Sequence, residues 1–301
     1  ATMAAYNGSA LGNHHYTPMS SAEMIDAAVV SVFRKKHYIA PNCILSGAGV
    51  GHDDFLKLAN TYFGSMPNGI VEKRPSAAYK GGIHLNEREL KEPFVKVSVG
   101  FEIDGFESYC DTVPVCVLQM LLGGGSSFSA GGPGKGMYTR LYRELLNRYH
   151  WVEGAEAFVA LYNDFNSGIF GIDGTCKADD VPKMMQVLTD QLVRLAAQPV
   201  TDEELSRAKN MLKSMMLMQL ESRLVLCEDI ARQIATYNKR MTPSELSIKI
   251  DAVTKDDLQR IAAKMICGPP TVGAVGEDLS MVPPFHMMQD LVHRFKQQAG
   301  V

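Results

Sequence analysis

The sequence lacks several features that would assign it to a protein class at once. It has no Cys-x-x-Cys pair, because its six cysteines are scattered at positions 43, 110, 116, 176, 227 and 267. This pattern is typical of reduced thiols in a reducing compartment and argues against a disulfide framework or a zinc cluster. The longest uncharged run, 112–134, is mostly apolar only over 113–122. That is about half of the roughly 20 residues that span a bilayer, so no transmembrane helix is expected.

Neither sign of charge dominates, and no targeting peptide is visible. The chain has 30 Lys and Arg against 33 Asp and Glu, a net charge of −3. It therefore lacks the basic balance that nucleic-acid binding usually needs. With 46% apolar and 21% charged residues, it can bury a sizeable core, which excludes wholesale disorder. The sequence starts at Ala1 with no initiator Met and no Arg-rich or signal segment, so we expect that it is not a complete protein.

Helical and strand-like periods alternate along the chain. Periodicity and capping residues predict helices over 21–38 (capped by Ser20 or Ser21), from Asp53 or Asp54 to about 62, 113–122, about 138–149, 181–195, from a Thr201–Glu204 capping box onward, 255–265 and about 287–295. Strands are predicted over 43–50, 95–103, 155–162, 168–175 and 271–275. The clearest strand signal is the period-two alternation of apolar residues from Val95 to Ile103.

A helix–strand–helix pattern occurs twice. The pattern at 21–63 recurs at 254–295, and both strands are rich in Gly, Ala and Val. Internal duplication predicts two similar domains, of which the first lacks its front. We therefore expect the closing part of a truncated first domain over 1–66, a Pro- and Gly-rich linker over 67–82, and a second domain over 83–301.

The most unusual segment is Gly123–Gly136, with seven glycines in fourteen residues. It opens onto a predicted helix, yet it fits neither a P-loop nor a Gly-x-Gly-x-x-Gly fingerprint nor a Gly-x-Ser-x-Gly nucleophile elbow. Composition alone leaves two alternatives. The segment is a flexible connector, or it is a loop whose backbone contacts an extended peptide.

Residues 123–142 resemble the glycine-rich loop of the α subunits of mitochondrial processing peptidases, within the pitrilysin-like metallopeptidases (peptidase family M16). The resemblance continues through 146–151, 204–209, 220–223 and 228–229, includes 16–18 and 43–51, and so spans nearly the whole chain. One departure is Ser126, where this family usually has a fourth consecutive Gly. The resemblance implies an α+β fold of two-layer domains, each a mostly antiparallel sheet with helices on one face.

The same resemblance implies a function. The expected protein is the non-catalytic, presequence-recognising subunit of a heterodimer in the mitochondrial matrix, whose catalytic β subunit carries the zinc. No cofactor is then expected in this chain. The alternative is a structural core subunit of the cytochrome bc1 complex (complex III), attached to the matrix side of the inner membrane and bound to the other subunits of that complex. Near-complete retention of the glycine-rich loop favours the first alternative.

The predicted presequence contacts lie in the loop and on acidic residues outside it. The loop residues are Gly123, Gly124, Gly125, Ser126, Ser127, Phe128, Ser129, Ala130, Gly131, Gly132, Pro133, Gly134, Lys135 and Gly136. Because presequences are basic amphipathic helices, a receptor should also offer acids. The acidic candidates are Glu153, Glu221, Glu228 and Asp229, with Glu156 and Asp164 as further acids. From the residue types alone, each is more often a solvated surface acid or half of an intramolecular ion pair.

The zinc motif of this family, His-x-x-Glu-His, supplies two His ligands and a Glu that activates water. None of the eight histidines begins such a motif. The nearest fragments start at His84 and His150, but Arg88 and Gly154 stand where the second His should be. We therefore predict no metal site and no catalytic residue in this chain.

Overall fold

The computed structural model describes residues 1–72, 77–88, 93–105, 109–124, 137–162 and 167–300. The chain divides into two compact units. Unit 1 comprises residues 1–13, 76–215 and 244–301, and unit 2 comprises residues 14–75 and 216–243.

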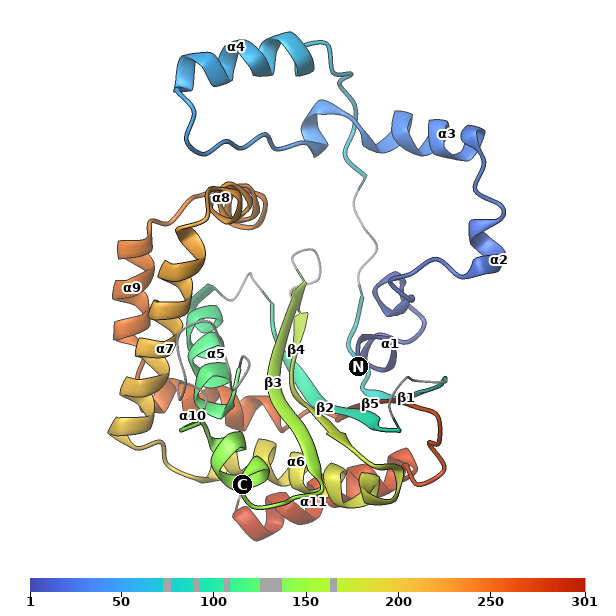
Figure 1. Ribbon diagram of the computed structural model, residues 1–301, viewed down its shortest axis with the longest axis vertical. Coiled ribbons are helices and arrows are strands. Elements are labelled where there is room, and N and C mark those ends of the chain that lie inside the picture. The colour runs from blue at the N-terminus through green and yellow to red at the C-terminus, as the bar shows by residue number, and fades with distance from the viewer. Residues whose placement is uncertain (73–76, 89–92, 106–108, 125–136, 163–166, 301) are drawn as a thin grey trace. The chain divides into compact units, whose positions relative to one another are not determined.

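Unit 1 is built around a five-stranded sheet with strand order β1-β5-β2-β4-β3 (Figure 1). The strands are β1 (Gly82–Glu87), β2 (Val95–Asp104), β3 (Val152–Tyr162), β4 (Ser167–Cys176) and β5 (Thr271–Gly276). Only the β1–β5 pair is parallel, and the three other pairs are antiparallel. The mostly antiparallel sheet is therefore confirmed. The alternation in β2 is confirmed as well, since its five apolar residues from Val95 to Ile103 are all buried.

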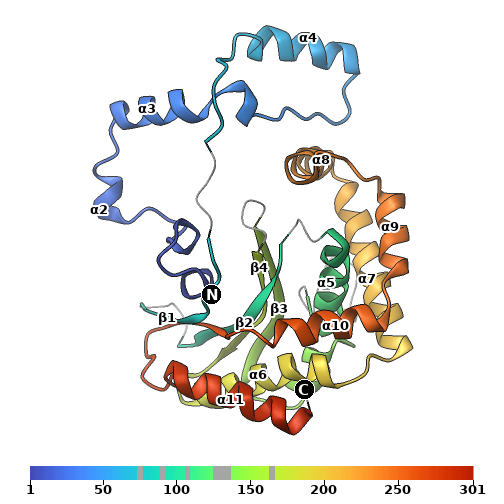
Figure 2. The ribbon, with the colours of Figure 1, turned by 180° about the vertical axis from the view of Figure 1, so that it is seen from behind.

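Helices cover one face of this sheet and create the main core. They are α5 (Tyr109–Leu122), α6 (Val181–Ala197), α7 (Asp202–Leu220, which continues into unit 2), α9 (Pro243–Ala252), α10 (Lys255–Met265) and α11 (Phe285–Ala299), with a π-helical turn η3 (Tyr142–Leu146) and a 3-10 turn η4 (Ala178–Asp180). The helices α5, α6 and α10 contact the strands, and α11 packs on α6 (Figure 2). The predicted two-layer α+β architecture is confirmed.

The other face of the sheet carries the start of the chain. The short helix α1 (Thr2–Ala5), followed by the 3-10 turn η1 (Ala10–Gly12), lies next to β1 and β5. The buried Tyr6 ring meets the rings of Tyr79 and Tyr162 edge to face, and its hydroxyl lies 2.7 Å from the Ser167 hydroxyl. The Lys80 N–H donates to the carbonyl of residue 5 at 2.8 Å. The residues just before and just after segment 14–75 are thus joined within unit 1.

Unit 2 is helical and buries little of its apolar surface. Its helices are α2 (Met19–Ala22), α3 (Ala27–His37), α4 (His52–Phe63) and α8 (Arg223–Tyr237), with a 3-10 turn η2 (Ala40–Asn42). Neither α3 nor α4 contains a buried residue. The prediction of one helix starting at Ser21 is wrong. The long helix begins at Ala27, because the Asp26 carboxylate accepts a hydrogen bond from the Val29 N–H at 2.8 Å and caps it there.

The predicted strand at 43–50 is also wrong, because no residue of this segment is in a strand. A strand needs a neighbouring strand to satisfy its backbone, and every described strand belongs to the sheet of unit 1. The Ser46 hydroxyl instead donates to the Cys227 carbonyl of α8 at 2.8 Å.

The predicted helix at 138–149 is shorter than expected. Its regular part ends as η3, and the Tyr138 carbonyl accepts from the Arg207 side chain at 3.2 Å instead of from a residue of its own helix. The remaining predicted helices and strands are confirmed, with ends shifted by a few residues. Strand β1 and helices α1, α8 and α9 were not predicted. In the described part of the chain, no helix combines the length and apolar character that crossing a membrane requires.

Candidate functional site

The glycine-rich segment starts where α5 meets the edge strand β3. The Gly123 carbonyl accepts a hydrogen bond from the Ala157 N–H at 3.0 Å. The Gln119 side chain donates to the Ala157 carbonyl, also at 3.0 Å. Gly123 has a φ of +143°, which favours glycine at this position. The start of the segment is therefore fixed to β3 by two hydrogen bonds, one to the N–H and one to the carbonyl of Ala157.

The described residues just after the segment are fixed by an ion pair between the buried Arg140 and the half-buried Glu204. The Arg140 guanidinium donates from Nε and Nη2 to the two carboxylate oxygens of Glu204, at 2.8 and 3.0 Å. Glu204 also completes the predicted capping box, since Oε2 accepts from the Thr201 N–H at 3.0 Å. The hydrogen bond from Arg140, followed by those from Thr201, lowers the pKa of Glu204 to about 2. One carboxylate thus joins the residues just after the segment to the start of α7.

The described residues on the two sides of 125–136 also lie against each other. A Cβ atom built on Gly123 would lie only 3.2 Å from the Leu141 side chain, so Leu141 packs directly over this glycine. Leu141 is itself buried in the main core. Residues 125–136 lie between these fixed ends but outside the described residues, so the predicted contacts of Gly125 to Gly136 stay a prediction.

Beside the end of the segment, the surface of α7 is hollowed. The hollow has a volume of about 630 Å³ and is lined by Tyr138, Glu203, Ser206, Arg207, Asn210, Met211 and Ser214. The Arg207 guanidinium lies 5.1 Å from the centre of the Tyr138 ring and pairs with Glu203. This gives the site an aromatic wall and an ion pair next to the fixed end of the segment.

The four acidic candidates are divided between the two units. Glu153 is exposed on β3 of unit 1. Glu221, Glu228 and Asp229 belong to unit 2. Two of these acids have partners on their own helix: Glu228 lies 3.8 Å from Arg232, and Asp229 accepts from the Gln233 amide at 2.8 Å. Their contact with presequences remains a prediction, as does that of Glu156, exposed on β3; Asp164 lies outside the described residues.

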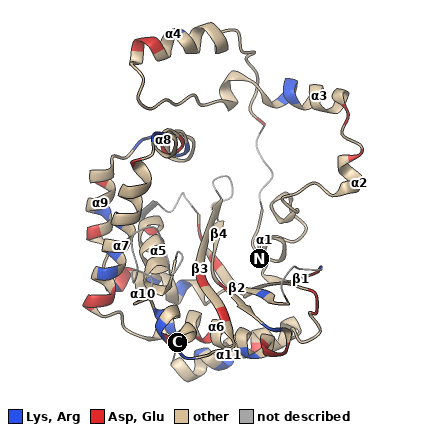
Figure 3. Cartoon of the chain, viewed as in Figure 1, with Lys and Arg blue, Asp and Glu red and all other residues tan. Residues whose placement is uncertain are grey.

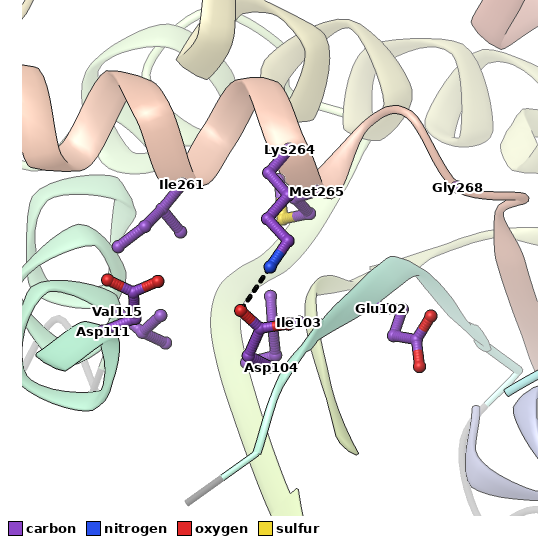
Figure 4. A pocket seen from close by; sticks show the side chains of 9 residues that line it. All are labelled: Glu102, Ile103, Asp104, Asp111, Val115, Ile261, Lys264, Met265 and Gly268. Atoms are coloured by element: carbon purple, nitrogen blue, oxygen red, sulfur yellow. Dashed lines mark hydrogen bonds and ion pairs between the residues drawn. The ribbon is translucent and has the colours of Figure 1, made fainter. Parts of the chain in front are cut away.

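A second cavity, of about 100 Å³, lies between β2, α5 and α10 (Figure 4). Its lining includes Glu102, Asp104 and Asp111. Lys264 pairs with Asp104, Arg260 makes two hydrogen bonds to Asp111, and Ser167 donates to Glu102 at 3.0 Å. Because side chains of this chain already engage all three acids, the cavity offers little uncompensated charge to a ligand.

Within the described ranges, no three His, Cys, Asp or Glu side chains gather as a metal ion would require. Figure 3 shows Lys and Arg interspersed with Asp and Glu over unit 1. The strongest candidate is therefore formed by the fixed residues on either side of 125–136, with the hollow beside them. Sequence reasoning found Glu204 as a helix cap but missed Arg140, Gln119 and Ala157, because each acts through a partner distant in sequence.

Comparisons with known proteins place the chain in a family. The model of the peptidase M16 inactive domain matches residues 25–212. The α subunit of the mitochondrial-processing peptidase of Solanum tuberosum is 37% identical over 272 residues, covering 90% of this chain and 53% of that protein. The corresponding subunit of Bos taurus is 36% identical over 301 residues, covering 95% of this chain and 56% of that protein. The chain thus spans about half the length of these relatives.

The fold is also that of a solved structure. A chain in complex III2 of Candida albicans, bound to Inz-5, superposes with a TM-score of 0.80 and covers 97% of this chain and 68% of its own length. At 16% identity, this likeness speaks for the fold alone. It agrees with the pitrilysin-like fold expected from the sequence. Since the family model matches more than half of its residues, the chain belongs to the peptidase M16 family.

Proposed function

We propose that this chain is the non-catalytic, presequence-recognising subunit of a mitochondrial processing peptidase, and that its glycine-rich segment contacts cleavable targeting peptides. The observation that carries the proposal is the similarity to α subunits of this peptidase along 90–95% of the chain. The match of residues 25–212 to the inactive domain of the family supports a non-catalytic role.

The geometry around Gly123–Gly136 supports a role in binding. A backbone that must approach a peptide closely benefits from glycine, and a binding loop benefits from ends that do not move. The described residues on both sides of 125–136 are held, at Gly123 by β3 and at Arg140 by Glu204. On this proposal, the partner is a catalytic β subunit that carries zinc, the ligands are presequence peptides, and the complex resides in the mitochondrial matrix.

The test is to purify the native complex through a tag on this chain, with and without residues 124–134. The deletion should leave assembly unchanged while kcat/KM for a basic amphipathic presequence peptide falls about tenfold, equivalent to about 1.4 kcal/mol. Asp111→Asn, in the cavity of Figure 4, is the control and should cleave normally. Unchanged cleavage by the deletion variant would refute the proposal.

A structural subunit of complex III is the second candidate, and the fold match to a chain of complex III2 favours it. Co-purification of cytochromes b and c1 with the tagged chain would support this role. The two roles are compatible, so the cleavage assay is run on whatever complex the tag retrieves.

We also propose that residues 1–66 and 83–301 belong to two copies of one domain architecture, joined by residues 67–82. The support is the repeated helix–strand–helix pattern in the sequence.

A further inference from the structure

We propose that Arg140 and Glu204 are positioning residues for peptide recognition, because their ion pair holds the described residues just after the glycine-rich segment against α7. The inference rests on the proposed function and deepens it. It concerns described residues only: the pair itself, the fixed start at Gly123, and the hollow bordered by Tyr138.

Arg140 is buried and Glu204 is half-buried, which is unusual for charged residues. The Arg140 side chain is 9% exposed and the Glu204 side chain is 19% exposed. A guanidinium in such a place is stabilised only if a carboxylate engages it with good geometry, and the two parallel hydrogen bonds provide this. A planar guanidinium bound at two atoms also has a fixed orientation, which an ammonium group would not give.

A second two-point pair in the same unit provides a reference. Arg260 of α10 makes two hydrogen bonds to Asp111 of α5, at 3.0 and 2.6 Å. The Arg260 side chain is 52% exposed, and this pair is not adjacent to the ends of the glycine-rich segment. The two pairs share their chemistry and differ in burial and place, so they form a matched test and control.

The Arg140–Glu204 pair is connected to its surroundings on both sides. Glu204 also caps α7 through Thr201, so its carboxylate cannot shift without disturbing the helix start. Next to Arg140 in sequence, Leu141 packs over Gly123, so a displacement of Arg140 and Leu141 reaches the start of the segment. On the same side, the Tyr138 carbonyl and ring contact Arg207, which lines the hollow.

The charge state of the pair does not change near neutral pH. The hydrogen bonds to Glu204 keep its pKa far below neutrality, and guanidinium groups stay protonated in proteins. Both groups therefore stay charged near neutral pH, and the ion pair does not act as a pH switch. Its loss should alter how well a peptide is bound rather than how fast a bound peptide is cleaved, because this chain holds no described metal cluster for the chemistry.

The experiment uses the native complex purified through a tag on this chain, with Arg140→Lys and Glu204→Asp as the test variants. Both retain the charges but lose the two-point geometry. We expect KM for a presequence peptide to rise about tenfold, the size of one lost charge-assisted hydrogen bond, with kcat changed less than twofold. The dissociation constant from fluorescence polarisation should rise in parallel. Arg260→Lys is the control and should leave both constants unchanged.

Assembly and thermal unfolding of each complex are measured alongside. A merely structural role would lower the amount of complex or its melting temperature but leave KM per assembled complex unchanged, and that result would overturn the inference. The deletion of residues 124–134 separates the two proposals. If the deletion raises KM and Arg140→Lys does not, the positioning role alone fails; if neither has an effect, the proposed function fails with it.

Discussion

The two copies of the helix–strand–helix pattern adopt different structures. In the copy at 254–295, strand β5 lies between β1 and β2 and pairs with both, while α10 and α11 bury seven residues. In the copy at 21–63, residues 43–50 form no strand, and α3 and α4 bury none. The local sequence patterns are alike. What differs is whether other parts of the described chain supply neighbouring strands and a core.

This difference shows that a strand-like sequence forms a strand only where neighbouring strands pair with it. The Ala274 position of β5 is aligned with Leu85 on one side and Val97 on the other, so its backbone is satisfied by two neighbours. Residues 43–50 have no such neighbours among the described strands. Many apolar side chains of this copy remain exposed, among them Phe33, Leu58 and Tyr62. Surface of this kind is typical of a segment that packs against further polypeptide.

The largest contrast should come from truncating a leucine in the second helix of each copy. Leu291→Ala in α11 removes a side chain buried in the main core and should cost about 2–5 kcal/mol in free energy of unfolding. Leu58→Ala in α4 removes a half-exposed side chain and should cost less than about 0.5 kcal/mol. Urea denaturation followed by circular dichroism measures both. Equal losses in the free energy of unfolding for the two variants would contradict the difference in burial between the two copies.

A smaller contrast is expected at the helix caps. Thr254 caps α10 and accepts from the Asp257 N–H at 3.1 Å, whereas Asp26 caps α3. Thr254→Ala should lower the free energy of unfolding of unit 1 by about 1 kcal/mol. Asp26→Ala should lower only local helicity, since α3 has no buried residue through which to affect the core. If Asp26→Ala lowers the urea midpoint as much as Thr254→Ala, α3 is coupled to the core after all.

The smallest effect concerns pH. Hydrogen bonds from Thr254 lower the pKa of Asp257 below its usual value. A carboxyl with a lowered folded-state pKa contributes stability that is present above its unfolded pKa, about 3.9, and is lost as pH falls through the lowered value. Urea midpoints between pH 6 and pH 2 should therefore fall less steeply for Asp257→Asn than for the native chain. Parallel curves would contradict the role of this cap.

Local patterns predicted much of unit 1. The alternation in β2, the hairpin of β3 and β4, the amphipathic α6 and α10, and the Thr201–Glu204 capping box all depend on residues close in sequence, and each is confirmed. The resemblance to a family supplied the two-layer fold. The errors at 21–26 and 43–50 arose where a competing cap or a missing neighbour decided the outcome.

Long-range features could not be read from the sequence. Strand β1 is only six residues long and becomes a strand by pairing with β5, almost 190 positions later. The Arg140–Glu204 pair joins residues 64 positions apart. The residue pattern around Arg140 does not predict that its guanidinium is buried. Of the predicted loop contacts, the structure describes only the positions of Gly123 and Gly124.

The most direct test of presequence recognition is photo-crosslinking in the native complex. A photoreactive phenylalanine analogue is placed at Phe128, within the glycine-rich segment, and as a control at Met287, an exposed position on α11. A labelled presequence peptide should crosslink at position 128 and not at 287, and excess unlabelled presequence should abolish the signal. A complex that cleaves the peptide but gives no crosslink at position 128 would contradict recognition by this segment.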